Sequence, residues 1–266
     1  MFQYATGLSV ATKLGTQLEL DATSYVSDDK RVYELDQFNV SSDGIKVIHK
    51  ENLLASLSNK FLFKKFNENY LKSNYDEKYL SIKDNTILDG YWQCGDYFEN
   101  VKEKVQAVFC VKEKDNSVFS EFAAKIKCEN SVSVHIRRGD YVVDDGKKGS
   151  HALLDLNYYD NANKWLLKKT SDIKLWIFSD DAYWVKEHFK TELPHEILSD
   201  SVELTSAEQI ILMSFCSHNI IANSSFSWWA AWLNKNRDKT VIAPKKWFLN
   251  NAGIDDKRIP SSWERI

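Results

Sequence analysis

Glycine and proline are scarce in this chain, and long apolar runs are absent. Nine glycines and three prolines stand among 266 residues, so turns have to be located mainly from clusters of Asn, Asp and Ser. No stretch approaches the roughly 18 consecutive apolar residues of a membrane-spanning helix. No basic segment followed by an apolar run marks a signal peptide at the start. We therefore expect a cytoplasmic protein, with peripheral contact at the inner face of the membrane left open as an alternative.

Paired cysteines and an excess of one charge are absent too. The four cysteines are far apart and show no C-x-x-C spacing, which argues against a zinc site or a disulfide framework. The 35 basic and 38 acidic residues give a net charge of −3, whereas a protein that binds nucleic acid over its surface is usually basic. Hydrophobic residues (43%) and charged residues (27%) have ordinary globular shares, which excludes disordered and fibrous classes.

Several signatures of common enzyme classes are missing. The chain has no Walker lysine loop, no G-x-G-x-x-G, no H-E-x-x-H and no G-x-S-x-G. P-loop NTPases, dinucleotide oxidoreductases, zinc proteases and serine hydrolases are therefore disfavoured.

The pattern of apolar residues divides the chain into two parts, 1–128 and 129–266. In the first part we expect a helix over 2–14, a strand over 16–20, helical patches around 61–71, a strand over 86–92 and a helix over 96–109. In the second part short apolar strands alternate with amphipathic helices. The expected strands are 131–137, 173–179, 219–223 and 240–243, and the expected helices are 155–169, 181–190, 206–217 and 226–236. This alternation predicts an α/β protein with a mostly parallel, doubly wound sheet.

The first candidate site is the segment SVSVHIRRGDY at residues 131–141. In a strand, His135 and Arg137 project from the same face, and Arg138 follows at the strand exit. Ligands of doubly wound sheets bind beyond the carboxyl ends of the strands, and two adjacent guanidinium groups suit a diphosphate. The alternative, which we weigh equally, is that both arginines pair with surface carboxylates.

The second candidate site is the segment HNIIANSSFSWWAAWL at residues 218–233. It reads as a buried strand, a polar turn at 223–225 and a tryptophan-rich helix, whose N-terminus offers free N–H groups to an anion. The alternative is ordinary capping of the helix by Ser224 or Ser225, and both can hold together. For the tryptophans of this helix we favour packing in the core.

A pair of acidic residues, Asp180 and Asp181, follows another expected strand. Metal-dependent glycosyltransferases hold a divalent ion with carboxylates spaced Asp-x-Asp. Here the acids are adjacent and their side chains diverge, so we favour capping of the following helix and expect no metal.

Four sequence blocks together resemble glycosyltransferase family 11, the α-1,2-fucosyltransferases, in its bacterial branch. The blocks are MFQYATG at 1–7, GYWQCGDYF at 90–98, HIRRGDY at 135–141 and NSSFSWWAAWL at 223–233, and IAPKKWF at 242–248 is also similar. The resemblance implies a GT-B-type fold of two Rossmann-like halves, an acceptor-side half over 1–128 and a donor-binding half over 129–266. It implies inverting transfer of L-fucose from GDP-β-L-fucose to the 2-hydroxyl of a terminal galactose in a surface or secreted glycan, without a metal or other cofactor. The acceptor glycan and the oligomeric state are left open.

Residues of these blocks can also be assigned to roles, with Asp140 chosen as the only carboxylate within the arginine segment. Asp140 is the candidate base for the attacking hydroxyl, although it could instead pair with a neighbouring arginine, and Arg138 would stabilise the charge of the departing GDP. Gln93 and Tyr97 are acceptor-side candidates. The implied donor-binding residues are His135, Arg137, Arg138, Asn223, Ser224, Ser225 and Ser227.

At its start the chain departs from the family pattern. Family members have a strand and a Gly-rich turn before the block that begins here at Met1, so we expect the N-terminal half to be truncated. Two alternatives to an active fucosyltransferase follow: an impaired remnant that still binds a GDP-sugar, and a related sugar-nucleotide transferase of different linkage.

Overall fold

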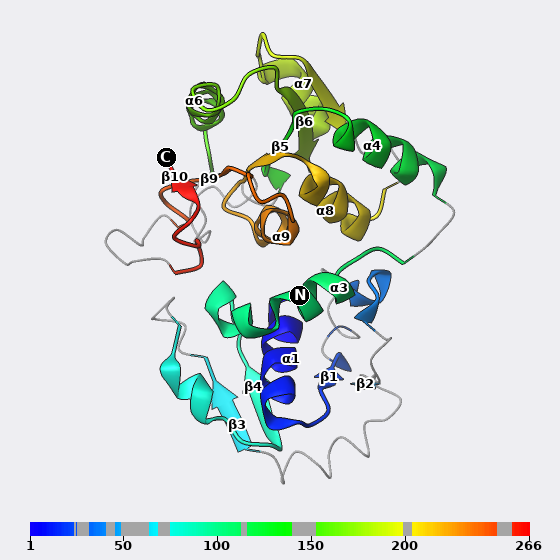
Figure 1. Ribbon diagram of the computed structural model, residues 1–266, viewed down its shortest axis with the longest axis vertical. Helices are drawn as coiled ribbons and strands as arrows, with labels where there is room; N and C mark the ends of the chain where they lie inside the picture. Colours follow the sequence, from blue (N-terminus) through cyan, green and yellow to red (C-terminus); the bar gives the residue numbers. More distant parts are fainter. Residues whose placement is uncertain are drawn as a thin grey trace. The chain divides into compact units, whose positions relative to one another are not determined.

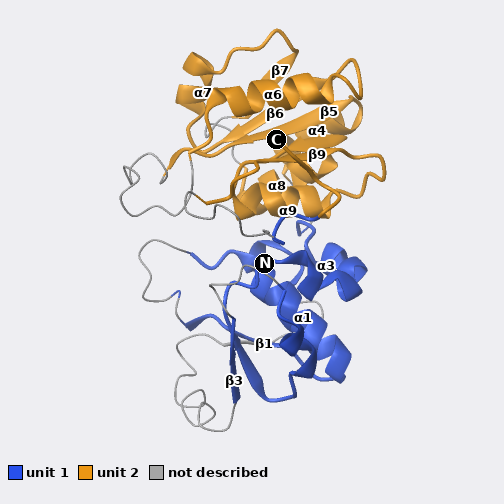
Figure 2. Ribbon diagram, turned by 90° about the vertical axis from the view of Figure 1, so that its left-hand side faces the viewer, with its two compact units in different colours: residues 1–112, 255–260 blue, residues 113–254, 261–266 orange. Residues whose placement is uncertain are grey.

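A computed structural model describes ten stretches of the chain, which form two compact units. The stretches are residues 1–23, 25, 32–40, 46–48, 64–68, 75–112, 116–139, 153–198, 204–248 and 257–266. Unit 1 consists of residues 1–112 and 255–260, and unit 2 of residues 113–254 and 261–266 (Figure 2). The predicted boundary between residues 128 and 129 therefore lies inside unit 2, because helix α4 (Ser117–Lys127) packs on a later helix of that unit.

Unit 2 is built on one six-stranded sheet in which every neighbouring pair is parallel. The strands lie side by side in the order β10–β9–β8–β5–β6–β7. The central strand β5 comes first in the chain, and β6 and β7 follow on one side of it. Strands β8, β9 and β10 then follow on the other side, which is the doubly wound Rossmann order. The strands are β5 (Ser131–Ile136), β6 (Lys174–Ser179), β7 (His195–Leu198), β8 (His218–Ile220), β9 (Val241–Ala243) and β10 (Glu264–Arg265).

Helices cover both faces of this sheet (Figures 1 and 2). Helices α6 (Leu156–Leu166) and α7 (Ala182–His188) pack on the face that carries Val132, Val134 and Ile136. Helices α8 (Ser206–Phe215) and α9 (Ser225–Leu233) lie on the other face. All five helices of unit 2 with described bounds begin at a capping side chain, namely Asn116, Asp155, Asp181, Thr205 and Ser224. Each cap satisfies a backbone N–H that the first turn leaves without a partner.

Unit 1 contains two separate pairs of parallel strands. Strand β1 (Glu19–Asp21) pairs with β2 (Lys46–Ile48), and β3 (Lys64–Asn67) pairs with β4 (Thr86–Asp89). Helix α1 (Phe2–Leu14) ends at Gly15, which adopts a left-handed conformation (φ 66°) that glycine tolerates best. The remaining elements are the 3₁₀ turns η2 (Leu35–Gln37), η5 (Glu77–Ser81), η6 (Gly95–Tyr97) and η7 (Glu99–Val101) and helix α3 (Lys102–Val108).

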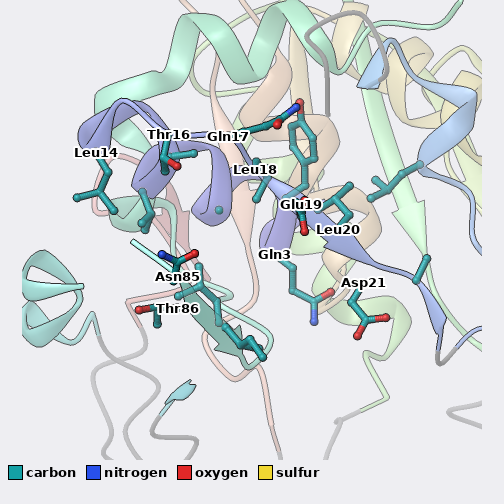
Figure 3. Close-up of a pocket in the computed structure, with 18 of the residues that line it drawn as sticks. Gln3, Leu14, Thr16, Gln17, Leu18, Glu19, Leu20, Asp21, Asn85 and Thr86 are labelled. Carbon is teal, nitrogen blue, oxygen red and sulfur yellow. The ribbon is translucent and has the colours of Figure 1, made fainter. Parts of the chain in front are cut away.

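A groove of about 530 Å³ separates β1 from β4, with α1 along it (Figure 3). Its lining includes Leu20 from β1, Thr86 from β4, and Gln3 and Leu14 from α1. Among the described residues, β1 and β4 each have a ladder partner on one side only. The described part of unit 1 therefore has no continuous sheet across its middle.

The α/β class and the mostly parallel sheets are confirmed, and so are the predicted helix over 2–14 and the four strands of the second part. The expected helical patches around 61–71 are wrong at Lys64–Asn67, which form strand β3, because pairing with β4 outweighs the local pattern. The strand expected over 16–20 lies at Glu19–Asp21. Helix α4 and strand β7 were not predicted. None of the described helices is long and apolar enough to span a bilayer.

Candidate functional site

The two candidate segments of the sequence meet in unit 2 where the winding of the sheet reverses. His135 is near the end of β5, and Ser227 is in the first turn of α9, which follows β8. Strands β5 and β8 are neighbours in the sheet. The imidazole Nδ1 of His135 lies 2.9 Å from the hydroxyl of Ser227, and both side chains are buried. This hydrogen bond joins the two segments at the edge of the sheet where ligands of such folds bind.

His135 is a neutral, fixed group. Burial, and secondly the positive charge of Arg137, lower the pKa of its imidazole to about 3. The hydroxyl of Tyr159, from α6, donates to the backbone carbonyl of His135 at 3.1 Å. The end of β5 is therefore held from both faces of the sheet, by Ser227 on one and Tyr159 on the other.

The two arginines that follow β5 pair with the two acids that follow β6. Arg137 Nη1 lies 2.8 Å from Asp180 Oδ2. The backbone N–H of Arg138 donates to Asp180 Oδ1 at 2.9 Å, and its Nε donates to Asp181 Oδ2 at 3.3 Å. The carboxylate pairing that was one of the two alternatives weighed from the sequence is therefore present. Pairing of this kind also restricts the direction of a guanidinium group.

Asp181 is also the N-cap of a helix. Its carboxylate accepts a hydrogen bond from the backbone N–H of Trp184 at 3.1 Å and caps helix α7, so the predicted capping role is confirmed. The indole of Trp184 lies under Arg138, with the guanidinium carbon 3.5 Å from the ring centroid. Trp184 in turn stacks on His188, with the two planes 10° apart. Arg138 is thus held by an ion pair at its Nε and by an aromatic ring on one face.

Gly139 permits the close approach of the arginine segment to β6. A Cβ atom at this position would lie 2.5 Å from Asp180 Oδ2, which is closer than non-bonded atoms can approach. Any larger residue would have to move the carboxylate that holds Arg137 and Arg138. Glycine therefore leaves room for the ion pairs beside it.

The N-terminus of α9 lies beside His135. Ser224 is the N-cap and accepts from the N–H of Phe226 at 3.3 Å, so the predicted capping is confirmed. Asn223 is buried and donates to the carbonyl of Trp247 at 3.0 Å, while Ser225 is exposed. The tryptophans of this helix lie in the core, as expected: Trp228, Trp229 and Trp232 are each at most 5% exposed.

Charge and geometry define what this edge of unit 2 can bind. Two guanidinium groups and a helix N-terminus occupy neighbouring strand exits, which is an arrangement suited to a polyanion such as a diphosphate. In the described part of the chain, no three His, Cys, Asp or Glu side chains gather as metal ligands would. Asp180 was not predicted as a partner of the arginines, and Trp184 and Tyr159 were not predicted as parts of the site. Asp180 follows β6, which is the neighbour of β5 in the sheet. Its pairing with the arginines could have been predicted only if the order of the strands had been known.

A family model described as Glycosyl transferase family 11 matches residues 16–262. The chain belongs to glycosyl transferase family 11. Two Escherichia coli relatives align over nearly their full lengths. The O-antigen biosynthesis glycosyltransferase WbnK is 30% identical over 94% of this chain and 92% of that protein. An alpha-1,2-colitosyltransferase is 34% identical over 100% of this chain and 94% of that protein.

More distant family 11 relatives and solved structures are also similar. Galactoside alpha-(1,2)-fucosyltransferase 2 of Pongo pygmaeus is 25% identical over 62% of this chain and 51% of that protein. Among solved structures, the fucosyltransferase NodZ from Bradyrhizobium aligns over 86% of each chain, with 14% identity and a TM-score of 0.45.

The remaining candidate site residues are Asp140, Gln93 and Tyr97. Asp140, the candidate base, is outside the described residues. Gln93 is partly exposed in unit 1. Tyr97 is 1% exposed, and its hydroxyl accepts from the N–H of Asp76 at 2.9 Å. It packs among Tyr75, Tyr79 and Trp92, so its side chain belongs to the core of unit 1.

Proposed function

We propose that this chain transfers L-fucose from GDP-β-L-fucose, with inversion, to the 2-hydroxyl of a terminal galactose in a bacterial surface polysaccharide. The observation that carries the proposal is the His135–Ser227 hydrogen bond. It brings the arginine segment and the N-terminus of α9 to one edge of the sheet, where a diphosphate would find both. Family membership and the names of the relatives support this type of reaction and this linkage.

The chemistry follows from the charge that develops as GDP leaves. Breaking the bond between the sugar and the β-phosphate places negative charge on the diphosphate, and preorganised positive groups stabilise that charge. Arg138 is fixed by Asp181 and Trp184, and Arg137 by Asp180, so little reorganisation is needed when the charge appears. In this proposal the arginines and the helix N-terminus balance the diphosphate without a metal ion.

Inversion requires a base that takes the proton of the attacking hydroxyl. Asp140 stays our candidate, because it is the carboxylate within the arginine segment and follows Gly139 directly. The neutral imidazole of His135 is buried against Ser227. We therefore assign it a positioning role at the end of β5 rather than the role of base.

A second candidate function is transfer of colitose in the same linkage. The relative named alpha-1,2-colitosyltransferase is 34% identical over 100% of this chain. The two candidates share the site, the nucleotide and the attacking hydroxyl, and differ in the sugar. A third possibility is an impaired remnant that binds a GDP-sugar without transferring it. Such a protein would retain only the diphosphate site.

The test is a transfer assay with purified protein, a β-galactoside acceptor and either GDP-fucose or GDP-colitose as donor. The product linkage is determined by NMR. Arg237→Ala serves as a control, because Arg237 is an exposed arginine that follows the C-terminal end of α9, whereas the site is at the N-terminal end of that helix. We expect an α-1,2-linked product with GDP-fucose. A product with GDP-colitose alone would favour the second candidate, and GDP binding without any product would favour the remnant.

A further inference from the structure

In unit 1, a short turn follows β4 at the carboxyl end of the strand pair β3–β4. The turn consists of residues 90–93, and Glu68 follows β3 at the same edge because the two strands are parallel. Carboxyl ends of parallel strands are where ligands of α/β sheets bind. The turn therefore lies where a substrate would bind to unit 1.

Side chains from two other elements hold this turn. Glu68 Oε2 accepts hydrogen bonds from two successive backbone N–H groups, those of Tyr91 at 2.7 Å and Trp92 at 2.9 Å. Gln3, from α1, donates its side-chain amide to the carbonyl of Gly90 at 2.9 Å. Gln3 also lines the groove between β1 and β4 (Figure 3). A carboxylate that accepts two backbone N–H groups is a strong anchor for a turn.

The backbone of the turn is strained and crowded. Trp92 has φ 57°, in the left-handed region that bulky residues avoid. A Cβ atom on Gly90 would lie 2.4 Å from Glu68 Cβ, so only glycine fits against that side chain. Strain of this kind persists where the surrounding contacts determine the conformation, and it gathers at functional sites.

The side chains of the turn divide into a buried and an exposed group. Trp92 is 0% exposed and stacks with Phe66. Its indole Nε1 has no hydrogen-bond partner in the described part of the chain. Tyr91, by contrast, is 55% exposed, and Gln93 and Glu68 are partly exposed. An exposed aromatic ring beside a carboxylate and an amide offers an apolar face and polar partners to a sugar ring.

We propose that the turn 90–93 is the element of unit 1 that binds the acceptor sugar, with Tyr91 and Gln93 in contact and Glu68 as the positioning residue. The inference rests on the proposed function, since the sugar is the galactose end of the acceptor glycan. It moves the acceptor role from buried Tyr97 to exposed Tyr91. Glu68 acts through the turn: its carboxylate fixes the two N–H groups and thereby the direction of the Tyr91 ring.

The test compares acceptor and donor kinetics of Glu68→Ala, Glu68→Gln and Tyr91→Ala. Glu99→Ala is the matched control, because Glu99 is an exposed acid of unit 1 paired with Lys102. We expect the KM for the galactoside to rise at least tenfold in Glu68→Ala and Tyr91→Ala. The rise should be smaller in Glu68→Gln, whose amide oxygen can still accept the two N–H groups. The affinity for GDP should stay within twofold of the wild type in all of them.

Two outcomes would overturn the inference. One is a galactoside KM within twofold of the wild type in both Tyr91→Ala and Glu68→Gln, the variants least able to disturb folding. The other is absence of galactoside binding to the wild-type chain by saturation-transfer NMR. If the wild type binds galactoside through Tyr91 but transfers no sugar, the proposed function is wrong and the turn 90–93 is still the part of unit 1 that binds the sugar.

Discussion

The imidazole of His135 and the hydroxyl of Ser227 lie 2.9 Å apart, although 92 positions separate them in the chain. This contact joins the end of β5 to the first turn of α9, and with them the two segments that could bind a diphosphate. Because both groups are buried, the bond is not weakened by competition from water. The arginine segment and the serine segment therefore form one site, and the predictions below concern that site.

Replacing Arg138 by alanine should weaken GDP binding at least tenfold, and replacing Arg137 should have a smaller effect. Removing a charged hydrogen-bonding partner of a phosphate costs about 1.5–3 kcal/mol. Arg138 is the more firmly held of the two, between Asp181 and Trp184. Lysine at either position should not restore affinity, because an ammonium group neither stacks on Trp184 nor donates as a planar fork. Calorimetric titration with GDP measures both effects.

The control for this pair is again Arg237→Ala, which removes an exposed arginine of the same unit and should leave GDP affinity unchanged. If both site variants fold and bind GDP as tightly as the wild type, the arginines do not belong to the donor site.

Gly139→Ala should lower both GDP affinity and stability, because its Cβ would lie 2.5 Å from Asp180 Oδ2. Overpacking of this kind typically costs about 1–3 kcal/mol. In an Asp180→Ala background the clash is gone, so the added methyl group should cost much less. Urea unfolding of the four proteins of this double-mutant cycle measures the difference. Equal costs in both backgrounds would show that Asp180 is not what excludes a side chain at residue 139.

Stability should fall as the pH drops below about 6.5, in part because of His135. Burial lowers the pKa of its imidazole to about 3 in the folded protein, against about 6.5 in the unfolded chain. Between these values the unfolded chain binds a proton that the folded protein does not, so acid favours unfolding. The contribution of one such group reaches about 1.4 kcal/mol per pH unit.

His135→Gln isolates this contribution, because the variant keeps a polar side chain but does not titrate. The free energy of unfolding should fall less steeply between pH 6.5 and pH 4.5 in the variant than in the wild type. The half-buried His218, whose pKa is also lowered by burial, is present in both proteins and cancels. Parallel curves for the two proteins would contradict the neutral, buried state of His135.

Transfer activity should persist in excess EDTA. The two acids that could have formed a metal pair, Asp180 and Asp181, already pair with Arg137 and Arg138, and the guanidinium groups can face the diphosphate themselves. A chelator titration of the transfer assay tests this. Loss of turnover that Mg²⁺ or Mn²⁺ restores would make the two acids candidates for metal ligands.

Much of unit 2 could be predicted from the sequence, because its strands are short apolar runs and its helices begin at clear capping residues. Thr205 with Glu208 three residues later is a capping-box pattern in the sequence, and both of its hydrogen bonds are present at the start of α8. The arginine and serine segments could also be located, since strand ends carry the ligands of such sheets. The partners of the arginines could not be chosen, because the pairing of Asp180 with Arg137 depends on which strand neighbours β5.

Unit 1 was harder to predict because its elements are stabilised by contacts between distant residues. Lys64–Asn67 have no strong strand pattern and become β3 only by pairing with Thr86–Asp89. Tyr97 was assigned to the acceptor side from its sequence block, yet its side chain is buried and its hydroxyl accepts a hydrogen bond from the backbone N–H of Asp76. Glu68 carried no signal at all, since its role depends on a turn more than twenty residues later and on the strained backbone of Trp92.

A crystal structure of the protein with bound GDP tests the central claim most directly. The account predicts that diphosphate oxygens lie within about 3.2 Å of the Arg138 guanidinium and of backbone N–H groups at the start of α9, with the His135–Ser227 hydrogen bond intact. A diphosphate bound elsewhere on the chain, out of reach of Arg137, Arg138 and the first turn of α9, would contradict it.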